Sequence, residues 1–196
     1  VGSIVLNLDV VELLNGVDLP EAPTAAGEKA AIKLFYSYSH KDEALREELN
    51  THLAILKRQK MIQEWHDRCI PPGGEWADAI DLHLEEADII PLLISADFVA
   101  SDYCYEKEMK RALERHKAGE ATVIPIILRE FRWKGADFAD LQALPKDGQP
   151  VAAHERRDTA WTEIAKRLEA VIQEKLEKKG KPGDSQGIER IKEEMR

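Results

Sequence analysis

The stretch that most constrains the fold is a nearly continuous apolar run in the middle of the chain, Ala87–Ile94. A strand with one wet face alternates apolar and polar residues, whereas a continuous run predicts a strand that is covered on both faces. Such strands belong to parallel sheets with helices packed on each side. Pro91 is unusual here, because a central strand needs the backbone N–H that proline lacks. The run therefore predicts the middle strand of an α/β domain.

Strand and helix patterns alternate on both sides of this run. Further strand patterns lie at residues 31–36, 61–65, 121–128 and 150–152. Apolar residues at helical spacing lie at residues 42–58, 75–86, 101–117 and 158–176. The alternation predicts three layers, with a central parallel five-stranded sheet between helices on both faces. For about five strands the common order is 2-1-3-4-5, in which ligands bind beyond the carboxyl ends of strands 1 and 3.

Composition divides the chain into a central domain and two flanking segments. Residues 1–30 end in a stretch rich in Pro, Ala, Gly and Thr, and we expect an N-terminal appendage or linker. Residues 31–178 carry the strand and helix patterns and are predicted to form one domain. Residues 179–196 are charged, and we expect a C-terminal linker or tail. Because the first residue is Val1 rather than Met, we expect fusion to other domains in a longer protein.

Charge and hydropathy exclude several classes of partner. The net charge is −9, and no strong cluster of basic residues offsets it, so we expect no binding to nucleic acid. No apolar run approaches the roughly 18–20 residues that a membrane helix needs, and no secretory signal is visible. The two cysteines, Cys69 and Cys104, do not form a disulfide framework. We therefore expect a cytoplasmic protein that does not bind membranes.

A helix begins just after the end of the third predicted strand, beside the expected ligand-binding edge. Ser101 or Asp102 can accept hydrogen bonds from its first backbone N–H groups. Cys104 and Glu108 then lie four residues apart, on one side of this helix. This places a thiol and a carboxylate near the crevice where a ligand is expected.

Several common sites are excluded by their missing motifs. Residues 35–39 at the end of the first strand contain no glycine, which argues against a dinucleotide-binding Rossmann motif or a P-loop. The cysteines and histidines lack the paired spacing of zinc ligands, so we expect no metal site. No Gly-x-Ser-x-Gly sequence occurs, which argues against an α/β-hydrolase nucleophile.

Four segments in chain order resemble the successive boxes of a bacterial Toll/interleukin-1 receptor (TIR) domain. They are Phe35–Glu43, Trp65–Asp67 with Ile70–Trp76, Ala87–Ser95, and Ser101–Cys104 with Glu108–Met109. The resemblance extends from about Ala31 to Leu176. The family has a flavodoxin-like sheet, which agrees with the strand and helix pattern. Many bacterial and plant members cleave NAD⁺ at the nicotinamide–ribose bond, often in defence against phage, and others act mainly as assembly modules.

The resemblance implies that Glu108 is the catalytic glutamate, because it lies on the third helix directly before the apolar Met109. Glu106 is the rival, since helical spacing places both glutamates beside the inward face, on opposite sides. The expected role is to hold the ribose hydroxyls and to stabilise the oxocarbenium-like cation as nicotinamide leaves. Judged from the residues alone, a mid-helix glutamate is most often a solvated surface residue.

The resemblance also implies a set of substrate-binding residues around this glutamate. They are Phe35, Tyr36, Ser37, Asp67, Arg68, Trp76, Ser101 and Cys104. The end of the first strand would line nicotinamide and ribose, and the loop after the second strand would close over the substrate. In that loop Trp76 would stack on the substrate and Arg68 would meet a phosphate. On spacing alone Phe35 and Trp76 fit core positions equally well, and Cys104 fits a packing residue.

Two functions follow as expectations from the resemblance. The first is a TIR-type NAD⁺ glycohydrolase or cyclase, the effector domain of a bacterial defence or signalling protein. It would be activated by self-association with other TIR domains, with NAD⁺ as substrate and no cofactor. The alternative is a non-catalytic TIR adaptor that only assembles with other TIR domains. A third and weaker option is a flavodoxin-like fold that binds another nucleotide.

Overall fold

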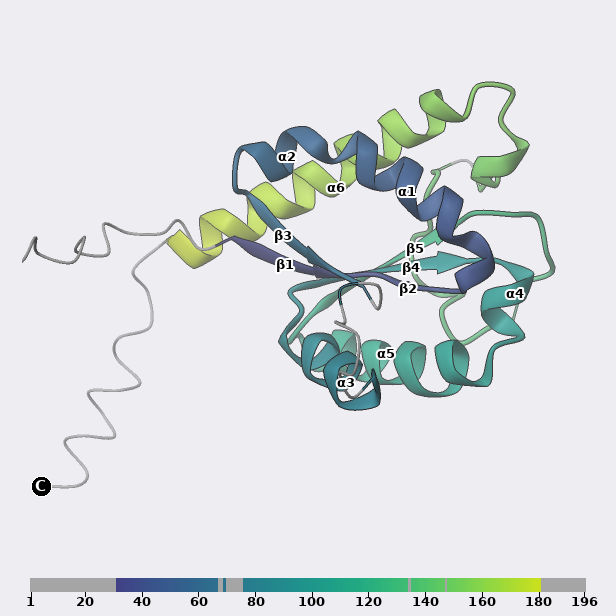
Figure 1. Cartoon of the computed structure of the whole chain (residues 1–196), viewed down its shortest axis with the longest axis horizontal. Coiled ribbons are helices and arrows are strands. Elements are labelled where there is room, and N and C mark those ends of the chain that lie inside the picture. The colour runs from purple at the N-terminus through teal and green to yellow at the C-terminus, as the bar shows by residue number, and fades with distance from the viewer. Residues whose placement is uncertain (1–30, 67–68, 70–75, 134, 147, 181–196) are drawn as a thin grey trace, which may run out of the picture.

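The computed structural model describes residues 31–66, 69, 76–133, 135–146 and 148–180. A parallel sheet lies between two layers of helices (Figure 1). Its strands are β1 (Ile32–Phe35), β2 (Ser37–Tyr38), β3 (Ile62–Trp65), β4 (Ile89–Ile94) and β5 (Thr122–Ile127). Every pair of neighbouring strands is parallel. The predicted flavodoxin-like α/β architecture is therefore confirmed.

The strand order is β3–β1–β4–β5, with β2 continuing the path of β1 alongside β4. When β1 and β2 are counted as the first predicted strand, β3, β4 and β5 are the second, third and fourth. The observed order then matches the first four positions, 2-1-3-4, of the predicted order 2-1-3-4-5. The registers Leu34 with Ile89 and Ser37 with Leu92 place Pro91 opposite Tyr36, at the break between β1 and β2. The N–H that proline lacks therefore falls where the ladder is already interrupted, which explains how β4 tolerates it.

The edge beyond β5 differs from the predicted fifth strand at residues 150–152. Val151–Ala153 form a single 3₁₀ turn, η4. Leu144 instead lies beside β5, where its N–H donates to the Pro125 carbonyl and its carbonyl accepts from the Ile127 N–H, both at 2.8 Å. Pro145 follows directly and has no N–H to extend the pairing. In the described residues, the place of the predicted fifth strand is therefore taken by a single β-bridge between Leu144 and Ile126.

The helices form one layer on each face of the sheet (Figure 1). The first layer contains η1 (His40–Asp42), α1 (Glu43–His52), α2 (Ala54–Arg58) and α6 (Arg157–Gly180). The second layer contains α3 (Trp76–Glu86), α4 (Ala96–Val99), η3 (Tyr103–Met109) and α5 (Lys110–Lys117). The helix predicted over 42–58 is divided at Leu53, and α6 runs on to Gly180, two residues past the predicted domain end at 178. The predicted appendage at 1–30 lies outside the described residues, as does the tail from 181.

Each face of the sheet buries its own apolar cluster. On the first face, α6 contributes Trp161, Ile164, Leu168 and Ile172, the inward positions predicted from its spacing, and all four are fully buried. On the second face, Phe35, Ile80, Phe98, Met109 and Ala112 are among the residues that pack under α3, α4, η3 and α5. The two clusters cover both faces of the sheet, and polar residues lie at its carboxyl edge, where β2 and β4 end.

Candidate functional site

A cavity of about 290 Å³ lies at the carboxyl ends of β1, β2 and β3, against the start of η3. Four parts of the chain line it: residues of Phe35–Lys41, Trp65 at the end of β3, Ile80 of α3, and residues of Ser101–Glu108. The position agrees with the rule that ligands bind beyond the strand ends at the point where the strand order reverses. Its volume is at the lower end of the range for ligand pockets, about 300–1,000 Å³.

Glu108 is the buried acid of this cavity. Its side chain is 6% exposed, and the Ser37 hydroxyl of β2 donates a hydrogen bond to its Oε2 at 2.5 Å. A buried carboxylate needs such donors, because burial without them costs several kcal/mol. Ser37 is itself fully buried, so the contact joins the sheet to η3 beneath the cavity.

Glu106 lies on the opposite, solvated side of the same segment. Its side chain is 55% exposed and pairs with Lys110 one turn further on. Tyr103–Met109 is π-helical, with backbone bonds five residues apart rather than four. Each residue of a π-helix advances through a smaller angle than in an α-helix, so α-helical spacing cannot phase these side chains. The structure therefore distinguishes the buried Glu108 from the exposed Glu106, which helical spacing alone did not distinguish.

The start of this helix is capped as the sequence predicts. The Ser101 hydroxyl accepts a hydrogen bond from the Cys104 N–H at 3.3 Å, and both residues line the cavity. Cys104 is buried, and its thiol lies 3.4 Å from the Tyr38 carbonyl of β2. The contacts from Ser37 to Glu108 and from Cys104 to Tyr38 hold η3 against the end of β2 at two points.

An aromatic wall closes the side of the cavity next to β3. The Phe35 and Trp65 rings stack with centroids 5.4 Å apart, and the His83 ring of α3 also stacks on Trp65 at 4.4 Å. Trp65 was not among the predicted site residues. The signal was present, because Trp65 is the last residue of the strand that neighbours β1, and parallel strands end at the same edge.

Burial raises the pKa values of two tyrosines of the site. Burial, with a further contribution from the negative charge of Glu108, raises the pKa of Tyr103 to about 12. Burial also holds the pKa of Tyr36 well above its usual value, and Glu64, which lies 3.4 Å from the Tyr36 hydroxyl, raises it further. Tyr103 is thus an uncharged phenol beside the acid at neutral pH.

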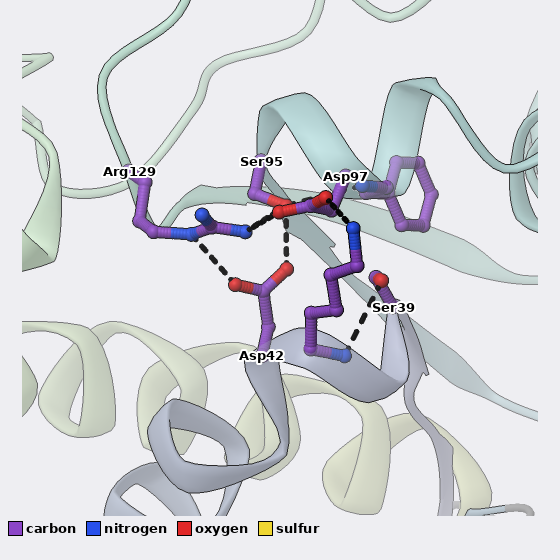
Figure 2. A network of polar contacts seen from close by, with 7 residues as sticks. Ser39, Asp42, Ser95, Asp97 and Arg129 are labelled. Carbon is purple, nitrogen blue, oxygen red and sulfur yellow. Dashed lines mark hydrogen bonds and ion pairs between the residues drawn. The ribbon is translucent and has the colours of Figure 1, made fainter.

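A polar network lies behind the cavity rim and joins the ends of β2, β4 and β5 (Figure 2). Asp42 follows β2, Ser95 and Asp97 follow β4, and Arg129 follows β5. Arg129 donates to the carboxylates of Asp42 and Asp97, and the Ser95 hydroxyl donates to Asp42. The network connects three chain segments at the carboxyl edge of the sheet. None of its residues was predicted to belong to the site.

The structure brings six of the predicted site residues together and leaves three undescribed in whole or part. Those that meet at the cavity are Phe35, Tyr36, Ser37, Ser101, Cys104 and Glu108. Asp67 and Arg68 lie outside the described residues, and only the backbone of Trp76, at the start of α3, is described. The cavity residues that the prediction missed are Tyr38, Ser39, His40, Lys41, Trp65, Ile80 and Tyr103.

Two further kinds of feature are absent from the described part of the chain. Within them, His, Cys, Asp and Glu side chains form no group of three or more that could hold a metal ion. No described helix combines the length and the apolar character needed to cross a membrane.

Comparison with known proteins gives one family. A family model described as a TIR domain matches residues 34–162. A protein of Sinorhizobium fredii (strain NBRC 101917 / NGR234), named "Uncharacterized protein y4lF", is 53% identical over 133 residues. That match covers 68% of this chain and 41% of the relative, so the chain spans less than half of the relative's length.

Two solved structures are also similar to this chain. One is the TIR domain of the Toll-related receptor TRR-2 from Hydra magnipapillata, with 22% identity, 71% of this chain and 97% of that chain covered, and a TM-score of 0.47. The other is the TIR domains of the activated Roq1 resistosome that recognises the effector XopQ, with 19% identity, coverage of 69% and 84%, and a TM-score of 0.41. The match of the family model runs from β1 into α6 and spans the whole sheet, and the chain therefore belongs to the TIR-domain family.

Proposed function

We propose that this TIR domain cleaves NAD⁺ at the nicotinamide–ribose bond, with Glu108 as the catalytic carboxylate. The observation that carries the proposal is the buried Glu108, which lines the cavity and accepts a hydrogen bond from Ser37 at 2.5 Å. Carboxylates with this degree of burial are few in any chain, and clefts at strand ends are where they serve chemistry.

The chemistry needs a fixed negative charge. When the C1′–N bond breaks, nicotinamide leaves as a neutral base and the ribose becomes an oxocarbenium-like cation. A carboxylate held beneath the ribose stabilises charge that develops only in the transition state, which is what accelerates the step. Water then adds to C1′ and releases a proton, or a nitrogen of the adenine ring adds and gives a cyclic product.

The cavity wall suits the rest of the substrate. Phe35 and Trp65 border the cavity with apolar aromatic side chains suited to the nicotinamide end of the substrate, and the hydroxyl of Ser101 lies at the cavity. Lys41 places a positive charge at the rim, where it attracts the diphosphate of NAD⁺. Asp67 and Arg68, which follow β3 in the chain, and Trp76 at the start of α3 remain proposed substrate contacts.

Self-association is part of the same proposal. A cavity of about 290 Å³ is small for a dinucleotide, so additional surface must cover part of the substrate. We assign that surface to a second TIR domain. The domain would then act as the effector of a longer cytoplasmic defence or signalling protein, switched on when copies gather.

The test follows nicotinamide release from NAD⁺ at high concentrations of the domain. Glu108→Gln keeps the size and hydrogen-bonding ability of the side chain and removes the charge, so release should fall by about 10²-fold or more. Glu106→Gln is the matched control on the same segment and should release nicotinamide at the parent rate. Circular dichroism checks that both variants are folded.

Two outcomes would overturn the proposal. Turnover retained in Glu108→Gln would remove the glutamate from the mechanism. A parent protein that releases no nicotinamide, even when crowded into assemblies, would favour the non-catalytic adaptor, in which Glu108 and Ser37 only join η3 to the sheet.

A further inference from the structure

The network behind the cavity rim has a buried carboxylate at its centre (Figure 2). Asp42 is 2% exposed, and both of its oxygens are bonded. Oδ1 accepts from Arg129 Nε at 2.8 Å, and Oδ2 accepts from the Ser95 hydroxyl at 2.5 Å. A buried carboxylate is stable only while such partners offset its desolvation, and Arg129 is the partner that brings the opposite charge.

Arg129 connects Asp42 to the segment after β4. Its Nη2 group donates to Asp97 Oδ2 at 2.5 Å and to the Ser95 hydroxyl at 3.2 Å. The planar guanidinium therefore spans two carboxylates from different loops, a geometry that the point charge of a lysine does not reproduce. Arg129 therefore joins the segment after β5 to the segments after β2 and β4, which are also joined directly by Ser95 and Asp42.

The network acts directly on the wall of the cavity. Asp42 ends the turn η1, and its N–H donates to the Ser39 carbonyl at 2.7 Å. Ser39, His40 and Lys41, which precede Asp42, line the cavity. Lys41 is also part of the network, because its ammonium donates a hydrogen bond to Asp97 Oδ1 at 2.7 Å. The turn is held at its end through Asp42 and at its side through Lys41.

We propose that Arg129 is a positioning residue that holds the turn Ser39–Asp42 in the cavity wall through Asp42 and Asp97. Arg129 follows β5 and is absent from the cavity lining, so it acts on the site through its contacts with Asp42, Asp97 and Ser95. Its effect on catalysis rests on the proposed function, whereas its effect on the turn does not.

The experiment uses two variants of Arg129. Arg129→Met keeps an apolar stem and removes the charge. Arg129→Lys keeps the charge but lacks the planar guanidinium that bonds two carboxylates at once. Arg111→Met is the matched control. Arg111 is also partly exposed and also bonds two carboxylates, Glu85 and Glu114, but on the outer surface of α3 and α5. Hydrogen exchange of the backbone amides is measured residue by residue in all three variants.

Arg129→Met should raise exchange at Lys41 and Asp42 about tenfold or more, since a charge-assisted bond of the network is lost. Exchange in α6 should stay at the parent rate. Arg129→Lys should give an intermediate rise, and Arg111→Met should leave exchange in the turn unchanged.

Two results would overturn the proposal. Unchanged exchange at Lys41 and Asp42 would show that Arg129 is not coupled to the turn. An equal rise across the whole chain would show a general loss of stability. If Arg129→Met does not fold, Arg129→Lys against Arg111→Met makes the same comparison.

Kinetics give a second readout. A displaced turn should raise the KM for NAD⁺ more than it lowers kcat, because the turn borders the substrate and Glu108 stays in place. A fall in kcat with KM unchanged would contradict positioning of the rim. If the parent protein shows no turnover, the proposed function fails, and hydrogen exchange still decides whether Arg129 holds the turn.

Discussion

Two helices pack against opposite faces of the same sheet and do so in different ways (Figure 1). Helix α6 is α-helical over its length and buries an unbroken apolar stripe, of which Leu168 is the middle. The helix formed by η3 and α5 starts with a π-helical segment and buries Glu108 beside Met109. A buried acid on a departure from regular geometry lowers stability, and such departures gather at functional sites. Both faces bury an apolar cluster, but only the face under η3 also buries the acid to which we assign chemistry. We call the face under α6 the stability face and the face under η3 the chemistry face.

The largest expected effect comes from breaking the stability face. Leu168 is fully buried, so Leu168→Ala should lower the free energy of unfolding by about 2–5 kcal/mol through lost burial and the cavity left behind. Urea unfolding measures the change. Nicotinamide release per folded molecule should stay near the parent value at low temperature. A loss under about 1 kcal/mol would mean that the α6 face is loosely packed and the comparison is wrong.

The same division explains how far the sequence predicted the structure. The apolar runs of β4 and β5 and the stripe of α6 follow regular periods, so their existence, order and inward residues were predictable. Glu108 and Glu106 were not separable, because the π-helical segment departs from the period on which the prediction rests. The resemblance to the family supplied what periodicity could not.

The remaining differences have local causes. Pro145 stops pairing beside Leu144, so the fifth strand is one bridge rather than a strand at 150–152. The network around Asp42 joins residues that are far apart in the chain: Arg129 is 87 residues from Asp42. Contacts of that separation leave no pattern in a single sequence, which is why this part of the site was not predicted.

A smaller effect should follow from loosening the chemistry face. Ser37→Ala removes the hydroxyl that donates to Glu108 Oε2, and a buried carboxylate that loses a donor costs about 1–3 kcal/mol. Nicotinamide release should also fall, because the carboxylate is less firmly oriented. Urea unfolding and the release assay measure the two effects.

The double variant Ser37→Ala with Glu108→Gln tests whether the effect of Ser37 depends on Glu108. If the two groups act as a pair, the second substitution should cost much less in the background of the first, in both stability and turnover. Additive losses would show that Ser37 and Glu108 contribute independently. Leu168→Ala, on the other face, should combine additively with Ser37→Ala, because distant sites that share no partners do not couple.

The smallest expected effect is the pH dependence that Tyr103 contributes on the chemistry face. Burial and Glu108 raise the pKa of Tyr103 to about 12, whereas a free tyrosine ionises near pH 10. The folded state therefore keeps the phenol proton to higher pH than the unfolded state. The stability that Tyr103 contributes is complete below about pH 10 and is lost as pH rises towards about 12. The free energy of unfolding should accordingly fall less between about pH 9 and pH 11 in Tyr103→Phe than in the parent.

The absorbance of tyrosinate measures the pKa of Tyr103 directly. Glu108→Gln should lower this pKa, and Leu168→Ala should leave it unchanged. A pKa that does not respond to Glu108→Gln would show that the acid carries no charge near this phenol, which removes the electrostatic difference between the two faces.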